Sequence, residues 1–313
     1  MLATFLHSFG PFVFRIGEFG PRWYGLSYVL SALVAYWLYR RLATRGYTDV
    51  APEKVADLIT WTGLFGVLLG GRIGWILFYG FSPNESHEHW WWMFEVWKGG
   101  MASHGGILGL VLVTFVLSRR WKISWTSIGD TLCVVATTGL FLVRCANFIN
   151  GELIGKPADA SLPWAVQFPR ELMETPVGRE EIAPKVTDAL QRPVTDIVET
   201  IPRDAETNRV LAEYLTPRHP SQLYEALLEG ALMFTVLWLM RTRCRVPRGV
   251  LTGSFFILYA TVRIIGEMFR EPDPAWAVGK ISAGQFLSLF MYGIGAAFIA
   301  WGLKTRHYEK ADL

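Results

Sequence analysis

Ten ionisable residues stand in parts of this sequence that are otherwise strongly apolar. Each charge placed inside hydrocarbon costs on the order of 2.5–3.5 kcal/mol, so such groups usually face a polar cavity or pair with one another. The set therefore predicts either a polar chamber or interhelical ion pairs that only fix packing. These residues are Asp57, Arg72, His104, Asp130, Arg144, Glu152, Glu225, Glu229, Arg263 and Glu267.

The spacing around two of the arginines indicates a phosphate ligand. Arg144 and Asn147 fall on one face of a helix. A guanidinium can bind a phosphate through two hydrogen bonds, and an Asn amide suits glycerol or carbonyl oxygens. Tyr259, Arg263 and Glu267 follow i, i+4, i+8 spacing, and we expect Glu267 to pair with Arg263 because an unpaired buried charge is costly. Two arginines on different helices share one natural ligand, a lipid phosphodiester.

Other polar positions leave two interpretations open. His104 lies between glycines that could clear space for a ligand, although a lone His is often structural. Gly70 and Gly74 flank Arg72 at helical spacing, which favours close helix packing. For Glu225 and Glu229, acids near the end of an apolar stretch, packing is also the favoured role.

The composition places these residues in a membrane protein. Apolar residues make up 51% of the 313 residues, the mean hydropathy is +0.27, and charged residues reach only 18%, against about 25% in soluble domains. A net charge of only +3 does not favour nucleic-acid binding. Cys133 and Cys145 lie in an apolar run, and no Cys/His spacing suits a metal. We expect no metal and no cofactor.

Seven stretches approach the roughly 20 residues that a spanning helix needs. Lys and Arg concentrate in the connections that follow the first, third, fifth and seventh of them, so that side is cytoplasmic. The predicted fold is an all-α membrane protein of about seven transmembrane helices, with the N-terminus outside and the C-terminus cytoplasmic. Because no signal-peptide cleavage site is evident, the N-terminus is expected to be mature. The stretches are 24–40, 55–80, 103–118, 128–149, 222–240, 250–268 and 283–303.

Residues 1–313 are expected to form a single integral membrane domain with one inserted segment. Residues 156–219 are polar and rich in Pro, and they are too long for a simple loop. We expect a small extracytoplasmic head or a mobile lid, with a passive solvated domain as the alternative. The aromatic run from His89 to Trp97 is typical of an interfacial anchor.

Several motifs together closely resemble one enzyme family, the phosphatidylglycerol:prolipoprotein diacylglyceryl transferases. The resemblance extends from Trp23 to the last helix and is weakest in 156–219. It rests on WYGLSY at 23–28, HGGILG at 104–109, RCANFINGELIG at 144–155, RHPSQLYEA at 218–226, and Arg263, Glu267 and REPD at 270–273.

The resemblance implies an activity, a location and a set of site residues. The family transfers the sn-1,2-diacylglyceryl group of phosphatidylglycerol to the lipobox Cys thiol of a preprolipoprotein signal peptide, releasing glycerol phosphate as bacterial lipoprotein maturation begins. It implies a bacterial cytoplasmic (inner) membrane protein, surrounded by membrane lipids, with its site toward the outer leaflet and no nucleic-acid partner. By motif, the residues expected to be catalytic are His104, Arg144 and Arg263. Those expected to contact substrate are Arg144, Asn147, Glu152, Gly155, Arg263, Glu267, Tyr24, Tyr79 and Tyr259.

The implied reaction is an alkyl transfer, in which a thiolate attacks the glycerol carbon that bears the phosphodiester oxygen. A thiol has a pKa of about 8.5, so a base or nearby cations must favour the thiolate. His104 is the candidate base, and an Arg-assisted water is the alternative. A lipid or solute transporter would also hold intramembrane charges, but no inverted repeat is evident. An intramembrane protease would need a Ser in a GxSxG-type motif or an HExxH motif, and neither occurs.

Overall fold

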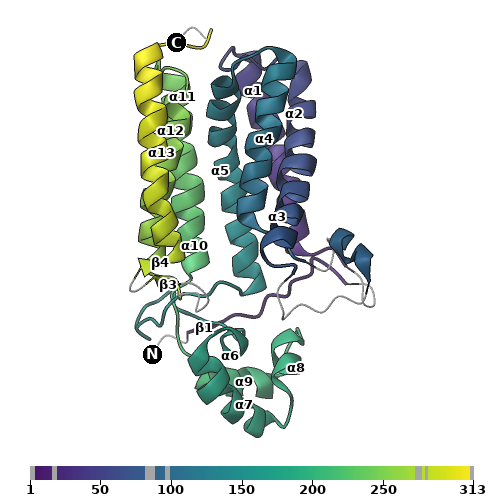
Figure 1. The fold of residues 1–313 in the computed structure, drawn as a ribbon. Helices are drawn as coiled ribbons and strands as arrows, with labels where there is room; N and C mark the ends of the chain where they lie inside the picture. Colours follow the sequence, from purple (N-terminus) through teal and green to yellow (C-terminus); the bar gives the residue numbers. More distant parts are fainter. Residues whose placement is uncertain are drawn as a thin grey trace. The chain divides into compact units, whose positions relative to one another are not determined.

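The computed structural model describes residues 4–15, 20–81, 89–95, 99–271, 277–278 and 281–310, most of them helical (Figure 1). The chain divides into two compact units, which are described separately. The first comprises Met1–Ser31, Ala136–Val236 and Ser254–Ala296. The second comprises Ala32–Val135, Leu237–Gly253 and Ala297–Leu313.

A long helix occupies each of the seven expected ranges. Among the described residues, four of these helices are long and apolar enough to cross a membrane: Pro52–Phe78, Trp125–Asn150, Ser221–Arg243 and Val250–Glu267. A helical membrane protein is therefore confirmed, whereas the seven crossings and their orientation stay predictions. The helices are α1 (Trp23–Thr44), the run η1 (Pro52–Lys54), α2 (Val55–Trp61), η2 (Thr62–Leu69) and α3 (Gly70–Phe78), then α4 (Ser103–Trp121), α5 (Trp125–Asn150), the run α10 (Ser221–Glu225), η6 (Ala226–Leu232) and α11 (Met233–Arg243), α12 (Val250–Glu267) and α13 (Ala283–Thr305).

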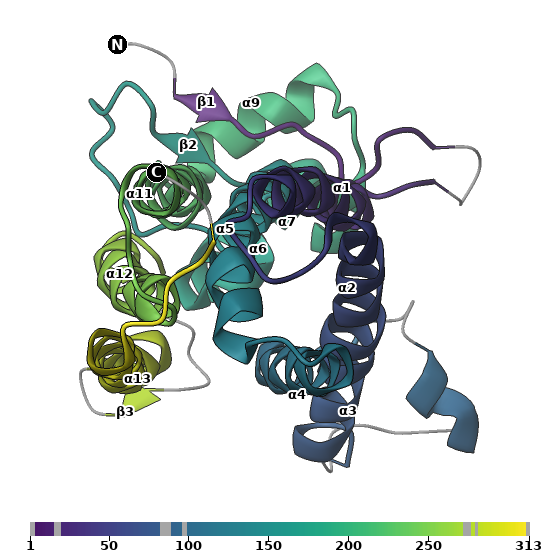
Figure 2. The same cartoon turned by 90° about the horizontal axis from the view of Figure 1, so that it is seen from above.

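In the second unit, η2 and α3 pack closely against α4 (Figure 2). A Cβ atom on Gly74 would lie 2.6 Å from the Cα of Gly105, and one on Gly70 would lie 3.0 Å from the Cα of Gly109. Small residues allow such backbone approach, which confirms the packing role predicted for Gly70 and Gly74. Gly105 beside His104 serves the same contact, so it does not clear space for a ligand.

Asp130, a predicted membrane charge, and Arg241, which was not in that set, both have structural partners in the second unit. Asp130 is fully buried and accepts hydrogen bonds from the Gly249 amide (2.7 Å), the Thr252 amide (2.9 Å) and the Thr252 hydroxyl (2.6 Å). It thereby caps the N-terminus of α12. Arg241, also buried, donates to the Tyr47 carbonyl and lies 3.6 Å from a carboxylate oxygen of Glu309. The packing interpretation is therefore confirmed for Asp130.

Arg72 of α3 is anchored entirely on backbone carbonyls. Its Nε donates to Met93 O (2.8 Å), its Nη1 to Gly99 O (2.8 Å) and Gly100 O (3.1 Å), and its Nη2 to Trp92 O. The side chain is buried. Arg72 therefore ties the connection between α3 and α4 to the helices.

The aromatic run in that connection forms a short helix, η3 (Trp90–Phe94). Trp92 is buried against Trp75 and Phe81, whereas Trp91 and Phe94 are exposed. Exposed rings of this kind suit a membrane interface. Residues 96 and 97, the end of the predicted anchor, lie outside the described residues, and the anchoring role stays a prediction.

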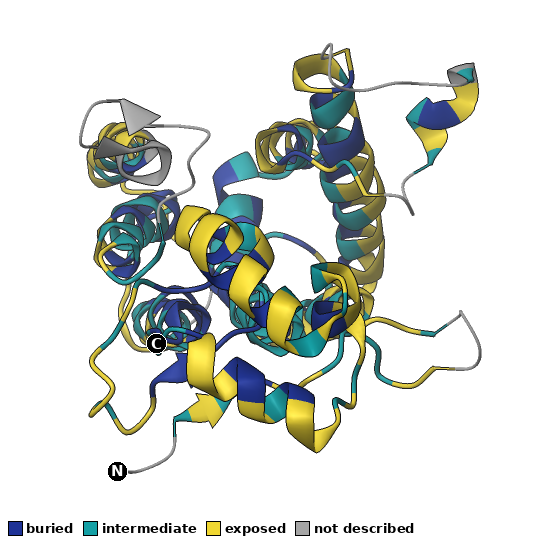
Figure 3. Ribbon diagram, turned by 90° about the horizontal axis from the view of Figure 1, so that it is seen from below, coloured by how far each residue is buried: buried dark blue, intermediate teal, exposed yellow. Residues whose placement is uncertain are grey.

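Residues 156–219, in the first unit, fold into short helices around their own apolar core. On these helices, buried and exposed residues alternate (Figure 3). We call this segment the head. Its helices are α6 (Glu171–Glu174), η5 (Gly178–Ile182), α7 (Ala183–Leu190), α8 (Val194–Glu199) and α9 (Ala205–Tyr214). Its buried core consists of Leu172, Ile182, Ala183, Val186, Ile197, Val198, Val210, Leu211 and Leu215.

The N-terminal segment is joined to the head by a strand pair, and its buried His7 imidazole forms a hydrogen bond to α5. β1 (Phe5–Leu6) pairs in parallel with β2 (Val166–Gln167). His7 donates from Nε2 to Phe148 O at 2.7 Å and is 3% exposed. Burial, with a smaller contribution from the charges of Arg203 and Arg170, lowers the pKa of His7 to about 4. A second small pair, β3 (Ala277–Val278) and β4 (Ile281–Ser282), precedes α13.

Candidate active site

Arg144 of α5 is held by two carboxylates from the helix run that begins with α10. Its Nε and Nη2 both donate to Glu229 Oε2 at 3.0 Å, and its Nη1 lies 3.0 Å from Glu225 Oε2. These contacts fix the plane of the guanidinium, because three of its nitrogens are each constrained.

Arg263 of α12 contacts the same two carboxylates. Its Nη1 donates to Glu225 Oε1 (2.9 Å) and Glu229 Oε1 (3.5 Å), and its Nη2 donates to Glu267. The predicted pair of Arg263 with Glu267 is thus present. Arg270 adds a third guanidinium, 3.4 Å from Glu225 Oε1. Arg144 and Arg263, which were predicted to share a ligand, therefore share Glu225 and Glu229 as partners.

The carboxylates in this cluster are more deeply buried than the arginines. Glu225 and Glu229 are 1% and 0% exposed, whereas Arg144 and Arg263 retain 14% and 15%. A guanidinium has five N–H donors. Arg144 makes two hydrogen bonds to carboxylates and a 3.0 Å ion pair, and Arg263 makes three hydrogen bonds to carboxylates. Each arginine therefore has N–H donors beyond these contacts.

A close helix approach brings Glu229 to Arg144. A Cβ atom on Gly230 would lie 2.5 Å from the Cβ of Phe141 in α5, so only glycine fits there. The segment η6, which contains Glu229, is wound as a π-helix, a geometry often found at functional sites. The sequence favoured packing for Glu225 and Glu229, whereas the structure places both at the centre of the arginine cluster.

Asn147 and Glu152 form a second polar group at the end of α5. Asn147 Nδ2 donates to Glu152 Oε1 at 2.7 Å, and Asn150 Nδ2 lies 3.4 Å from the same oxygen. Gln222 of α10 donates to the Glu152 carbonyl at 2.7 Å. Gln222 lies one turn before Glu225, so α10 contributes to both groups.

Gly155 has a packing role. It forms a bridge with Arg270, and a Cβ atom there would overlap the carbonyls of His219 and Phe269. Its predicted contact with substrate therefore stays untested, while close backbone packing explains the glycine. Next to it, Lys156 Nζ donates to Glu267 O (3.3 Å) and Met268 O (2.9 Å), which satisfies carbonyls at the end of α12.

Arg218 connects the head to the ends of α5 and α12. It is almost fully buried and contacts Glu171 Oε1 (2.7 Å), Glu271 Oε2 (2.8 Å) and Gly155 O (2.8 Å). Breaking a buried network of this kind leaves uncompensated charge. The sequence pointed to Arg218 only as part of a motif, because its partners lie far away along the chain.

The three predicted tyrosines have different surroundings. Tyr259 lies in the electrostatic field of Glu229, Arg144 and Arg263, on the stripe that carries Arg263. Tyr24 packs its ring against Tyr28, with centroids 5.3 Å apart. Tyr79, in the second unit, is the hydrogen-bond partner of His104.

His104 is the second residue of α4 and is exposed. Its Nε2 lies 3.3 Å from the Tyr79 hydroxyl, and the Phe78 ring meets the imidazole edge to face with centroids 5.6 Å apart. A hydrogen-bonded, accessible imidazole is suited to proton transfer. Of the three residues predicted to be catalytic, His104 lies with Tyr79 in the second unit, and Arg144 and Arg263 lie in the arginine cluster of the first.

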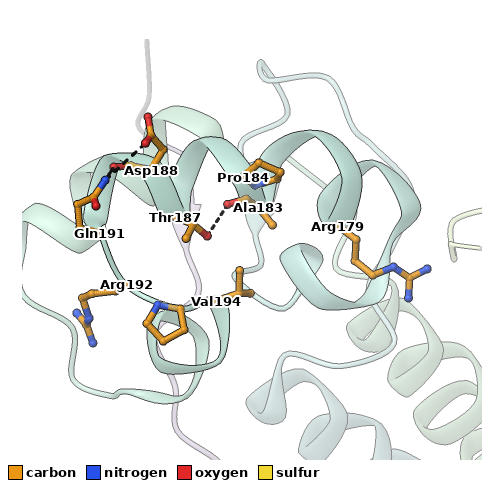
Figure 4. Close-up of a pocket in the computed structure, with 9 residues that line it drawn as sticks. Arg179, Ala183, Pro184, Thr187, Asp188, Gln191, Arg192 and Val194 are labelled. Atoms are coloured by element: carbon orange, nitrogen blue, oxygen red, sulfur yellow. Dashed lines mark hydrogen bonds between the residues drawn. The ribbon is translucent and has the colours of Figure 1, made fainter.

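A groove of about 710 Å³ lies on the head rather than at either of these groups (Figure 4). Thr187 donates to Ala183 O (2.7 Å) and Gln191 to Asp188 O (2.6 Å), so both side chains are engaged with their own helix. No nucleophile with an adjacent base lines it. Among the described residues, no group of His, Cys, Asp and Glu is arranged to hold a metal ion.

Comparison with known proteins identifies the family. The model for prolipoprotein diacylglyceryl transferase matches residues 11–301. The chain belongs to this family. Curated relatives named phosphatidylglycerol–prolipoprotein diacylglyceryl transferase include those of Bdellovibrio bacteriovorus (37% identity, 93% of this chain and 92% of the relative), Citrobacter koseri (37%, 97% and 97%) and Neisseria gonorrhoeae (36%, 96% and 99%). The family's relatives thus match this chain over nearly its full length.

Proposed function

We propose that this protein transfers the diacylglyceryl group of phosphatidylglycerol to the lipobox cysteine of prolipoproteins, forming a thioether and releasing glycerol phosphate. The observation that carries the proposal is the cluster in which Arg144 and Arg263 share Glu225 and Glu229 while both guanidiniums have N–H donors beyond these contacts. Family membership over residues 11–301 supports it.

Arg144 and Arg263 bind the phosphate of the donor lipid in this proposal. The carboxylates behind them hold each guanidinium in one orientation, so little reorganisation is needed when the ligand arrives. As the carbon–oxygen bond breaks, negative charge grows on the oxygen that leaves with the phosphate. Donors aimed at that charge stabilise the transition state more than the ground state.

The acceptor thiol must lose its proton before it attacks. His104 takes that proton, and Tyr79 orients the imidazole through its hydroxyl. Sulfur then bonds to the glycerol carbon, the bond from that carbon to the phosphodiester oxygen breaks, and glycerol phosphate leaves. Five other residues contact the lipid or position the groups that do: Asn147, Glu152, Glu267, Tyr24 and Tyr259.

Both substrates reach the site within the bilayer of a bacterial cytoplasmic membrane. The protein crosses it seven times, with its N-terminus outside and its C-terminus in the cytoplasm, so that the site faces the outer leaflet. Phosphatidylglycerol and the signal peptide enter sideways between helices, because both already lie in the membrane. The product also leaves sideways into lipid, because it carries acyl chains and cannot leave through water. The head, residues 156–219, is an extracytoplasmic cover that helps to recognise the peptide.

The test is a transfer assay with purified protein, phosphatidylglycerol and a lipobox peptide. We expect release of glycerol phosphate and a peptide that gains the mass of a diacylglyceryl group. A peptide with Ser in place of the lipobox Cys is the matched control and should give neither product. Lipid movement across vesicles without glycerol phosphate release would instead favour the transporter considered from the sequence.

A further inference from the structure

The last two turns of α1 carry an arginine groove on their exposed surface. A groove of about 460 Å³ is lined by Trp37, Arg40, Arg41, Thr44 and Arg45. All five residues are exposed. At 1.5 Å per residue, these turns lie about 20–30 Å along the helix from Tyr24. The groove therefore differs from the donor-lipid site proposed above.

The exposed face of α1 changes its chemistry in one direction along the helix. Val29, Leu33, Trp37, Arg41 and Arg45 follow strict i+4 spacing and form one stripe. The first three are 57%, 58% and 59% exposed, although they are large and apolar. The stripe thus runs from apolar to aromatic to basic residues. Membrane proteins show the same order from the hydrocarbon core of the bilayer to its headgroups.

The arginines of the groove lack acidic partners within the part of the chain that the structure describes. Arg40 donates to the Tyr36 hydroxyl at 3.4 Å, and Arg41 lies over the Trp37 ring at 5.7 Å. By contrast, Arg248 in the same unit pairs with Asp49 at 2.7 Å and Glu309 at 2.9 Å. The groove thus presents three cations whose charge is not balanced by any acidic group among the described residues.

These arginines are not needed to cap the helix. The end of α1 is closed by backbone bonds from Gly46 N to Ala43 O (3.1 Å) and from Tyr47 N to Leu42 O (3.1 Å), with Gly46 at a φ of 75°. Thr44 donates to Arg41 O at 3.0 Å, and its oxygen can still accept a hydrogen bond. The guanidiniums are therefore available to an external anion.

We propose that this groove binds the headgroup of an anionic phospholipid in the cytoplasmic leaflet. Arg40, Arg41 and Arg45 hold the phosphate with paired N–H donors. The acyl chains lie along the apolar part of the stripe, toward Leu33 and Val29, with Trp37 at headgroup level. The inference rests on the orientation given under Proposed function, in which this end of α1 is cytoplasmic.

The test counts bound lipid by native mass spectrometry on protein in detergent micelles titrated with dioleoylphosphatidylglycerol. The variant replaces Arg40, Arg41 and Arg45 with Gln. Because juxtamembrane arginines attract anionic lipids, we expect the affinity of one class of lipid site to fall about a hundredfold, which corresponds to about 3 kcal/mol. Dioleoylphosphatidylcholine should bind equally to both proteins, because it has no net charge.

A matched control replaces three other exposed arginines, Arg119, Arg120 and Arg243, with Gln. It removes the same charge from the same proposed side and should retain the lipid. Equal binding by the groove variant, or an equal loss in the control, would overturn the proposal. Displacement of the lipid by millimolar inorganic phosphate would also overturn it, because that result would indicate a site for soluble anions.

Glycerol phosphate release, measured on the same samples, keeps the two proposals apart. The groove variant should transfer at a rate close to that of the unchanged protein, because its substitutions lie far along α1 from Tyr24. If the unchanged protein releases no glycerol phosphate, the proposed function fails whatever the lipid count. If it does, and the groove variant loses no lipid, only the groove assignment fails.

Discussion

Arg72 and Arg144 are both largely buried arginines on long helices, yet they have different kinds of partner. Arg72 directs four of its five N–H groups at backbone carbonyls, which fastens the connection between α3 and α4. Arg144, like Arg263, is held by deeply buried carboxylates and has N–H donors beyond these contacts. An arginine surrounded by carbonyls serves the fold, whereas one positioned by carboxylates and still partly exposed is prepared for an anion.

The largest effect should follow from substituting Lys for Arg144 or Arg263. The charge remains, but the planar fork that binds both carboxylate and phosphate is lost. We expect turnover to fall by about 10²–10³, the range found when one donor to a developing oxyanion is removed. The measurement is glycerol phosphate release by each variant. Near-normal rates in both would show that these arginines, like Arg72, do not act on the phosphate.

His104→Gln should cost about 10² in turnover at neutral pH, because a positioned base is removed. The rate should recover partly as pH rises toward the thiol pKa of about 8.5, where thiolate forms unaided. A pH–rate profile beside that of the unchanged protein measures this. A loss that is the same at every pH would indicate that His104 positions the lipid or supports the fold.

Arg72→Lys should show the opposite pattern to Arg144→Lys. A lysine cannot reproduce four carbonyl bonds, and unsatisfied buried groups cost about 1–3 kcal/mol. We therefore expect a lower Tm, with turnover of the folded protein changed only a few-fold. Thermal unfolding and transfer assays on the same sample measure both quantities. A large loss of turnover at unchanged Tm would make Arg72 part of the site.

His7 shows how a group that can release its proton avoids becoming a buried cation. Its pKa of about 4 in the folded protein lies below the usual 6.5, so the unfolded chain binds more protons between these values. Stability is therefore complete above pH 6.5 and is lost as pH falls toward 4, by about 3 kcal/mol. In His7→Gln this slope of Tm against pH should flatten, and an unchanged slope would assign it to other groups.

The sequence predicted the helices well because their apolar runs are long. It also predicted the pair of Arg263 with Glu267, since both lie on one helix at i+4 spacing. The roles of Glu225 and Glu229 could not be predicted, because they depend on which helix faces meet, and a glycine contact at Gly230 decides that. The fold of the head was also beyond prediction, since its short helices are stabilised by a shared core rather than by local pattern.

The account's central claim is that Arg144 and Arg263 hold a phosphate that leaves with the oxygen it shared with the lipid carbon. The most direct measurement uses phosphatidylglycerol with ¹⁸O at the position linking the diacylglyceryl carbon to phosphorus. After transfer to a lipobox peptide, mass spectrometry should find all of the label in the released glycerol phosphate and none in the lipidated peptide. Label in the peptide would mean that the phosphorus–oxygen bond had broken, which contradicts attack of sulfur on carbon.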